Sequence, residues 1–257
     1  MFLRLSSNIG TGFKAKTTIL LSVVFFFAAS LTDVQAQKRF SRLYPAASNV
    51  RLQLMNRSGT ITVEGWDRPQ VAIAATLEAP AANIEPQVIQ GSTIIINLVK
   101  DNQGREVGNV NFNIRVPFST MVDIETRMGN LNVSNVRSGL VRARISSEGD
   151  ISLTNIGSSA VSAENTMGDI FFDGELTSGG TYRFASMRGN INLRLPFNSS
   201  FRLVATAPST RNISLGIFGN DGFSYVGDGR RVVGKNGDGS ATLSVTNQQG
   251  SISFIRR

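Results

Sequence analysis

A glycine-centred pattern recurs along this chain and limits its fold more than any other feature. Each copy has a glycine, a small polar residue after it, and apolar residues two and four positions on. Four consecutive copies are centred on Gly129, Gly149, Gly168 and Gly189, at intervals of 20 (129 to 149), 19 (149 to 168) and 21 (168 to 189) residues. A second alternating apolar pair precedes each glycine. The pattern predicts a tandem array of units with two short strands each.

Further copies of this template lie near the two ends of the chain. Leu52 and Leu54 precede Gly59, and Gly250 follows a similar pair near the C-terminus. A degraded copy spans residues 210–215, where Arg211 stands in the place of the glycine. We therefore count six regular copies and one irregular copy.

The glycine has a physical reason to recur, because the chain must change direction sharply between the two strands of a unit. Glycine reaches positive φ without a steric penalty, and a neighbouring Asp, Asn, Ser or Thr can bond to the turn backbone. A unit of about 20 residues buries too little apolar surface to fold alone, so copies must stack. We predict an all-β fold, either a β-solenoid or a flattened two-sheet β-roll. The alternative is an antiparallel meander folded into a sandwich, which a constant period does not favour.

The chain divides into three predicted segments: residues 1–36, an N-terminal β cap at 37–118, and a β-repeat region at 119–257. In the cap, residues 37–48 resemble a short lead-in. The sequence predicts strands over 50–55, 60–64, 71–75, 88–90, 93–99 and 110–116. Gly91 and Ser92 predict a hairpin turn, and 101–104 a loop. The glycine-rich segment 216–239 is read as an irregular insertion, with short strands over 223–226 and 232–233.

The first 36 residues have the three parts of a Sec-type signal peptide. Arg4, Lys14 and Lys16 precede an apolar run over 19–29, and cleavage is expected after Ala36. The apolar run is shorter than the roughly 20 residues of a membrane-spanning helix, although an uncleaved anchor is the alternative. No second long apolar run follows, so we expect no helical membrane span after cleavage. The protein is then expected in the periplasm, on the outer surface or secreted.

Composition excludes several kinds of chemistry. The chain has no Cys and no His, which removes disulfides, thiolate nucleophiles, imidazole bases and the usual zinc ligands.

The formal net charge of the chain is +8, and it falls to +6 without Arg4, Lys14, Lys16 and Asp33. The basic residues are spread out and lack aromatic stacking partners, so nucleic acid is not expected. Envelope polysaccharide, lipid headgroups or another envelope protein remain as partners.

Two phosphate or metal motifs are matched only in part. The segment Gly229–Asn236 resembles a phosphate-binding loop, but Asn236 replaces the Ser or Thr, and a β-like run follows instead of a helix. Calcium needs six to eight oxygens from closely spaced ligands. The candidates are scattered, and turn stabilisation explains them better. They are Asp150, Asp169, Asp221, Asp228 and Asp238.

Glycoside hydrolysis needs two carboxylates that face each other across a cleft. The candidate carboxylates are scattered at outward positions: Asp123, Glu125, Glu148, Glu164 and Asp173. Trp66, Tyr44, Tyr182 and Tyr225 are too few for an obvious sugar platform, and Tyr182 occupies a core position of the repeat. We therefore assign no catalytic residue, no cofactor-binding residue and no metal ligand.

Several motifs together resemble a bacterial family. They are Val63-Glu64-Gly65-Trp66-Asp67-Arg68-Pro69, Ile114-Arg115-Val116-Pro117, the Gly-Asp/Asn-Ile units, and the closing strands 243–246 and 250–254. The chain resembles the putative adhesin family, a β-strand-repeat domain of unknown function, over about residues 48–256. The resemblance implies a fold but no catalytic residues. The chain departs from it at Arg211 and over 216–239.

The sequence favours an exported, non-enzymatic β-repeat protein of the cell envelope with a binding, adhesion-like or structural surface. A polysaccharide-processing enzyme on a β-helix scaffold is the main alternative. An outer-membrane β-barrel ranks last, because its strands would be longer and flanked by aromatic girdles.

Overall fold

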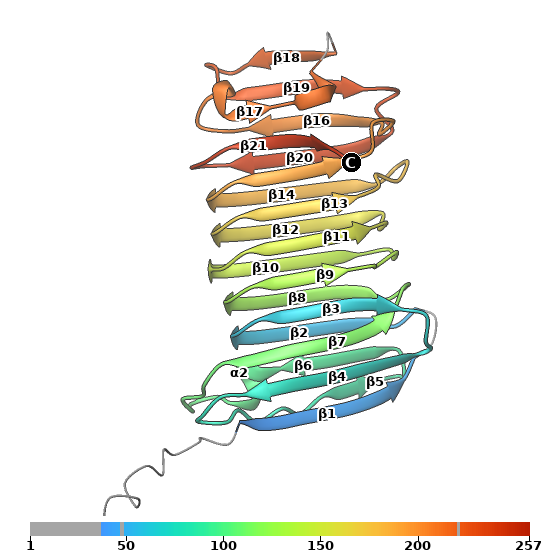
Figure 1. The fold of residues 1–257 in the computed structure, drawn as a ribbon, viewed down its shortest axis with the longest axis vertical. Helices are drawn as coiled ribbons and strands as arrows, with labels where there is room; N and C mark the ends of the chain where they lie inside the picture. Colours follow the sequence, from blue (N-terminus) through green and yellow to red (C-terminus); the bar gives the residue numbers. More distant parts are fainter. Residues whose placement is uncertain (1–36, 47–48, 220–221) are drawn as a thin grey trace, which may run out of the picture. The chain divides into compact units, whose positions relative to one another are not determined.

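The computed structural model describes residues 37–46, 49–219 and 222–257, so the predicted signal peptide lies outside the described residues. Gln37–Arg257 forms one compact unit. Within it, two sheets contain nearly all the regular structure (Figure 1).

Sheet A comprises, in spatial order, β1 (Lys38–Pro45), β4 (Gln70–Leu77), β7 (Val110–Pro117), β3 (Ile61–Trp66), β9 (Leu131–Ser134), β11 (Ile151–Ile156), β13 (Ile170–Gly174), β15 (Ile191–Leu195), β21 (Ile252–Arg256) and β17 (Ile213–Ser214). Sheet B comprises β18 (Phe223–Val226), β19 (Arg231–Asn236), β16 (Phe201–Thr206), β20 (Ala241–Asn247), β14 (Thr181–Arg188), β12 (Ala160–Met167), β10 (Val141–Glu148), β8 (Met121–Met128), β2 (Arg51–Ser58), β6 (Thr93–Asn97) and β5 (Gln87–Ile89). The described residues also form three short helices, α2 (Leu98–Asp101), η1 (Thr210–Asn212) and η2 (Gly216–Phe218).

Each glycine-centred copy forms one rung, with its first strand in sheet B and its second in sheet A. Neighbouring rungs pair in parallel and in register, for example Val141 with Val161 in sheet B and Ile151 with Ile170 in sheet A. The predicted solenoid of stacked rungs is therefore confirmed, and the antiparallel meander is wrong. Parallel pairing follows from the pattern, because identical units stacked by translation place like strands side by side.

The rungs do not stack in chain order. The Gly59 rung lies between β6/β7 on one side and the Gly129 rung on the other. At the far end, the Gly250 rung pairs with the Gly189 rung and separates it from β16 and β17. In Figure 1 the strands of the C-terminal rung accordingly lie below β16. The two copies that are distant in sequence thus complete one continuous stack.

The core lies between the two sheets. Apolar residues two and four places after each glycine point inward, as do those of the preceding strand. Leu52, Ile61, Val122, Leu131 and Ile191 are all fully buried. Every described core residue falls between Val50 and Phe254, so residues 37–257 contain the whole described core.

Polar side chains connect the turns at the glycine end of the rungs. The side-chain oxygen of Asp150 accepts the backbone N–H of Asp169 at 2.8 Å, and Asp169 accepts that of Asn190 at 2.7 Å. Asn130 and Asn190 continue the series at 2.9 and 3.2 Å. The predicted role of these residues in turns is confirmed, but each bonds to the next rung instead of its own.

Antiparallel strands occupy both ends of the stack. β1 pairs with β4, β4 with β7, and β5 with β6, which confirms the antiparallel N-terminal cap. The prediction of a lead-in over 37–48 is wrong, because residues 38–45 form β1. The strand expected over 93–99 ends at Asn97, whose side chain accepts the Lys100 N–H and so begins α2.

At the other end, β18 and β19 form a hairpin on β16, and so confirm the short strands expected in the glycine-rich segment. Arg211 lies in η1, capped by Ser209, where the regular copies have a glycine turn. β17 then pairs for only two residues, Ile213 and Ser214. Stacking is therefore irregular here, as the missing glycine predicts.

Candidate functional site

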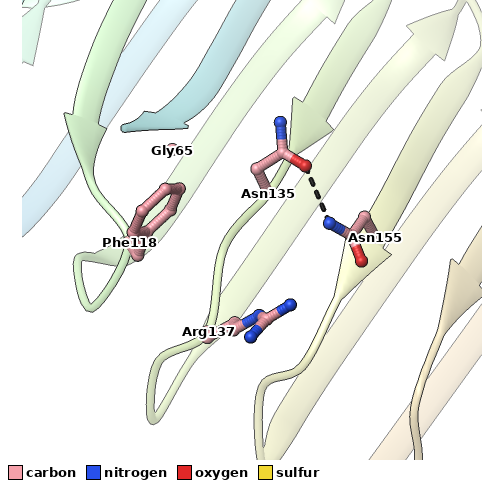
Figure 2. A pocket seen from close by; sticks show the side chains of 5 residues that line it. All are labelled: Gly65, Phe118, Asn135, Arg137 and Asn155. Atoms are coloured by element: carbon pink, nitrogen blue, oxygen red, sulfur yellow. Dashed lines mark hydrogen bonds between the residues drawn. The ribbon is translucent and has the colours of Figure 1, made fainter. Parts of the chain in front are cut away.

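The bend at the end of the sheet A strands carries a hollow of about 400 Å³ (Figure 2). It is lined by Gly65, Phe118, Asn135, Arg137 and Asn155. Each rung bends first at its glycine and again after its sheet A strand, so we call this site the second-bend hollow. These residues come from the ends of β3, β7, β9 and β11 or directly follow them. The hollow therefore spans three adjacent rungs and β7.

Two asparagines form its upper wall. Asn135 and Asn155 have φ of 58° and 53°, which is the left-handed conformation that Asn tolerates better than most residues. The Asn155 Nδ2 donates to the Asn135 Oδ1 at 2.8 Å, drawn as a dashed line in Figure 2. The Nη2 of Arg257 donates to the Asn155 Oδ1 at 3.2 Å. The amides are thus fixed in orientation.

A glycine lies next to Asn135 in the lining of the hollow. A Cβ on Gly65 would lie 1.9 Å from the carbonyl oxygen of Asn135, so only glycine lets the two rungs approach this closely. Phe118 stands beside Gly65, and 44% of its surface is exposed. Its backbone is held on both sides: Phe118 N–H donates to the Trp66 carbonyl at 3.1 Å, and Arg137 N–H donates to the Phe118 carbonyl at 2.7 Å.

Arg137 is the charged group of the hollow. Its stem lies near Gly157, where an added Cβ would be 3.2 Å from Arg137 Cγ. Its side chain is exposed, and among the described residues no carboxylate lies within 4.0 Å of its guanidinium. Five N–H donors are therefore offered to solvent in a hollow that an aromatic ring and an amide pair also line.

A second groove of about 330 Å³ adjoins the hollow, and Phe118 lines both. Its apolar wall is formed by Trp66, Pro69 and Pro117. The guanidinium carbon of Arg68 lies 5.2 Å from the Trp66 ring centroid, within cation–π range. Trp66 is held by its Nε1–H, which donates to the Gln70 carbonyl at 2.8 Å. The two hollows thus form a strip of aromatic rings and guanidinium groups.

The motifs weighed in the sequence lie elsewhere. The segment 229–236 is a turn and strand β19, followed by a further turn and β20, so it is not a phosphate loop. Asp150 and Asp169 belong to the inter-rung ladder, and Asp228 lies in the turn after β18. Within the described ranges no cluster of three or more acidic residues could hold a metal ion. Asp221 lies outside the described residues.

Asp238 occupies a turn between β19 and β20. Its carboxylate accepts a hydrogen bond from the Ser200 hydroxyl and another, at 2.9 Å, from the Ser240 N–H. These bonds, with that of Ser200 first, lower the pKa of Asp238 below its ordinary value of 3.8. The carboxylate is thus explained by turn formation.

Three of the five candidate carboxylates of a hydrolase contact arginines. Asp123 contacts Arg142 at 2.7 Å and Arg51 at 3.0 Å, Glu164 contacts Arg183 at 3.1 Å, and Asp173 contacts Arg257 at 3.2 Å. Glu125 lies beside Asp123 on β8, and Glu148 ends β10. None of these five lines the second-bend hollow.

The aromatic candidates separate in the fold. Tyr182 is fully buried, and its hydroxyl donates to the Ser158 carbonyl at 2.9 Å and accepts the Thr177 N–H at 2.7 Å, which confirms its packing role. Tyr44 packs against the core, and Tyr225 is exposed on β18. Only Trp66 belongs to the strip.

Sequence reasoning missed Phe118, Asn135, Arg137 and Asn155. One signal was available: Phe118 follows a strand-ending Pro117, outside the inward alternation of 110–116. Nothing local indicated that Arg137 would lie beside it.

The sequence profile of the family described as Toastrack DUF4097 matches residues 45–254. The chain belongs to this family. The resemblance to an adhesin-like domain of unknown function is thereby confirmed, and the Toastrack fold agrees with the stacked sheets. A search of curated proteins finds no match.

Solved structures that a structural search matches to this Toastrack chain have low identity to it. One, from Clostridium sporogenes, is described as a "putative cell adhesion protein"; it is 13% identical, covers 86% of this chain and 100% of its own, and has a TM-score of 0.48. Another, from Bacteroides fragilis, is described as a "putative adhesin" (13% identity, 86% and 97% coverage, TM-score 0.30). A third, from Parabacteroides distasonis, is described as a "putative lipid binding protein" (9%, 86% and 97%, TM-score 0.34).

Among residues 37–46, 49–219 and 222–257, no helix has the length and apolar character that a membrane crossing requires.

Proposed function

We propose that this Toastrack protein is exported and acts at the cell envelope as a non-enzymatic binding protein. Its ligand is an acidic polysaccharide, and the second-bend hollow with its adjoining groove is the binding strip. The observation that carries the proposal is the exposed guanidinium of Arg137, which has no carboxylate partner among the described residues and lines the same hollow as an exposed Phe118 ring.

Each part of a uronic acid residue has a counterpart in the strip. A guanidinium holds a carboxylate through two parallel hydrogen bonds, which a lysine cannot imitate. The faces of Phe118 and Trp66 offer apolar surface for the C–H groups of a sugar ring. The fixed amides of Asn135 and Asn155 offer hydrogen bonds to hydroxyl groups.

The shape of the strip favours a polysaccharide over the other envelope partners. The strip crosses several rungs from Arg68 to Asn155, as an extended chain would require. Its walls carry amides, guanidinium groups and aromatic rings, with one carboxylate, Asp67, in the adjoining groove. An acyl chain needs a continuous apolar lining instead. A phosphate headgroup would use Arg137 but leave the aromatic rings without a partner.

Export rests on the sequence of residues 1–36, which we assign to a Sec-type signal peptide cleaved after Ala36. The remaining chain keeps the cap over 37–118 and the repeats over 119–257. A non-enzymatic role is supported by the carboxylates, since Asp123, Glu164 and Asp173 each contact an arginine. N-terminal sequencing of the exported protein tests the cleavage position, and a start other than Gln37 would contradict it.

The binding proposal is tested by calorimetric titration of residues 37–257 with a polyuronate, such as alginate. A neutral glucan serves as the comparison ligand. Arg137→Gln removes the charge and keeps most of the stem, so we expect the affinity for the polyuronate to fall about tenfold or more, the equivalent of one charge-assisted hydrogen bond. Phe118→Ala should weaken binding to a similar extent.

Arg144→Gln is the matched control, because Arg144 is an exposed arginine on sheet B, outside the strip. It should bind as the wild type does. Equal losses for Arg137→Gln and Arg144→Gln would mean that only net charge matters. Equal affinity for the neutral glucan, or no binding of the polyuronate, would contradict the proposal.

A further inference from the structure

The two edge strands of sheet B leave core-side residues exposed. β5 lies at one edge and β18 at the other. Val88 of β5 is in register with buried Ile94, and Tyr225 of β18 is in register with buried Val232, so both lie on the inward face. Yet 48% of Val88 and 64% of Tyr225 is exposed, because each lies beyond the end of the core. One more strand at either edge would cover them.

Both edges also offer backbone groups for pairing. In an antiparallel pair, alternate residues direct their N–H and C=O groups away from the partner strand. β5 pairs only with β6, and β18 only with β19, among the described strands. Natural proteins usually protect such edges with charged side chains, as β1 does here with Lys38, Arg39 and Arg42. The sequences of β5 and β18, Gln-Val-Ile and Phe-Ser-Tyr-Val, contain no charge.

Strand directions make the two edges compatible. β18 is antiparallel to β19, which is antiparallel to β16, so β18 runs in the same direction as the rung strands of sheet B. β5 is antiparallel to β6 and therefore runs opposite to them. A second copy translated along the stack would place its β5 antiparallel to β18 of the first.

Charges match at the same end of the two edges. Glu85 precedes β5, and its N–H is bonded to the carboxylate of Asp101 at 3.1 Å. The turn after β18 carries Asp228 and Arg230, and Arg231 begins β19 directly after it, so two positive charges accompany one carboxylate. Both groups lie at the glycine-turn end of the sheet, where Figure 1 shows α2 and the head of the β18 arrow on the same side. Glu85 and Asp101 of one copy would meet Arg230 of the next, while Lys100 of α2 and Arg57, whose Nη2 donates to the Asn102 carbonyl at 3.1 Å, add positive charge to the same corner as Asp101.

We propose that copies of this chain assemble end to end, with β18 of one copy added to β5 of the next. The contact joins two different surfaces of copies that are related by translation along the stack, so it leads to an open filament of continuous sheet B. The partner is a second copy because this chain carries both complementary edges, in directions that match between copies. The assembly is independent of the polysaccharide proposal, since neither edge contributes to the strip.

The test is sedimentation velocity on residues 37–257 over a range of concentrations. We expect the average mass of the wild type to rise with concentration. Val88→Lys blocks one edge and Tyr225→Lys the other, because each places a charge where the neighbouring copy would bury it. Each variant alone should stay monomeric.

The decisive sample is an equal mixture of the two variants. Each has one intact edge, so the mixture should form dimers and nothing larger; these dimers also show that both variants are folded. Met187→Lys, at an exposed position on β14 away from both edges, should assemble like the wild type. A wild type that stays monomeric, single variants that assemble, or a mixture that stays monomeric would each overturn the proposal.

Discussion

Replacement of Gly168 by alanine tests how the rungs are held together. Gly168 has φ of 122°, and an added Cβ would lie 2.2 Å from the Gly149 carbonyl oxygen and 2.8 Å from the Asp150 Oδ1. A Cβ does not approach an oxygen this closely, so the turn must move away from the neighbouring rung. The substitution therefore combines backbone strain with the loss of contacts between rungs.

The magnitude follows from these two parts. A left-handed backbone costs a non-glycine residue about 1–2 kcal/mol. The Gly149 N–H donates to the Met167 carbonyl, and the Gly168 N–H to the Arg188 carbonyl, both at 2.9 Å. Loss of both hydrogen bonds costs about 1 kcal/mol each. We expect Gly168→Ala to lower the free energy of unfolding by about 3–4 kcal/mol, a large part of the 5–15 kcal/mol that is typical of whole domains.

Guanidinium chloride unfolding, followed by far-UV circular dichroism, measures this change. Alanine substitutions at two other glycines separate the backbone strain from the loss of contacts between rungs. Gly104 has φ of 72° and open space around its Cβ position, so Gly104→Ala should show only the backbone cost, about 1–2 kcal/mol. Gly139 has open space and no left-handed φ, so Gly139→Ala should change the stability little.

The relative losses of unfolding free energy in the three variants test whether the close approach of the rungs contributes to stability. If Gly168→Ala destabilises no more than Gly104→Ala, the close approach of the rungs contributes nothing, and the recurring glycines serve only the turn conformation.

Two further predictions concern single side chains. Tyr182→Phe should lower the free energy of unfolding by about 1–3 kcal/mol, because the buried carbonyl of Ser158 loses its donor. Chemical denaturation measures this loss, and an unchanged midpoint with an unchanged slope would contradict the prediction. The hydrogen bond from Ser200 lowers the pKa of Asp238, so its stabilisation of the turn is complete above the ordinary value of 3.8 and is lost as the pH falls through the lowered value. Amide exchange at Ser240 should accelerate in that acidic range, and in Asp238→Asn the acid-dependent step should disappear.

Much of the rung could be predicted from the sequence. The two-residue alternation around Gly149 and Gly168 specifies which side chains enter the core, and the glycine specifies where the chain bends. These are local properties, because a strand's inward face and a turn's φ depend on neighbouring residues. The same logic identified the irregular copy at Arg211, where the turn is a 3-10 helix instead.

The candidate site was not predictable in this way. Trp66 and Phe118 are 52 residues apart in the chain (66 to 118), and they line one groove because the Gly59 rung pairs with β7. Arg137 joins them because the Gly129 rung stacks on the opposite side of the Gly59 rung. These neighbours are set by long-range strand pairing.

The sequence by itself determined the unit: an inward alternating pair, a glycine turn with a polar residue, and a second inward pair. Only the tertiary structure decided the order of the units, with the Gly59 copy inside the stack and the Gly250 copy placed before β16. The reason is that the copies carry nearly the same pattern, so any one could pair with any other by local rules. The order depends on the connections and on the irregular strands at each end, and that order assembles the aromatic and guanidinium strip.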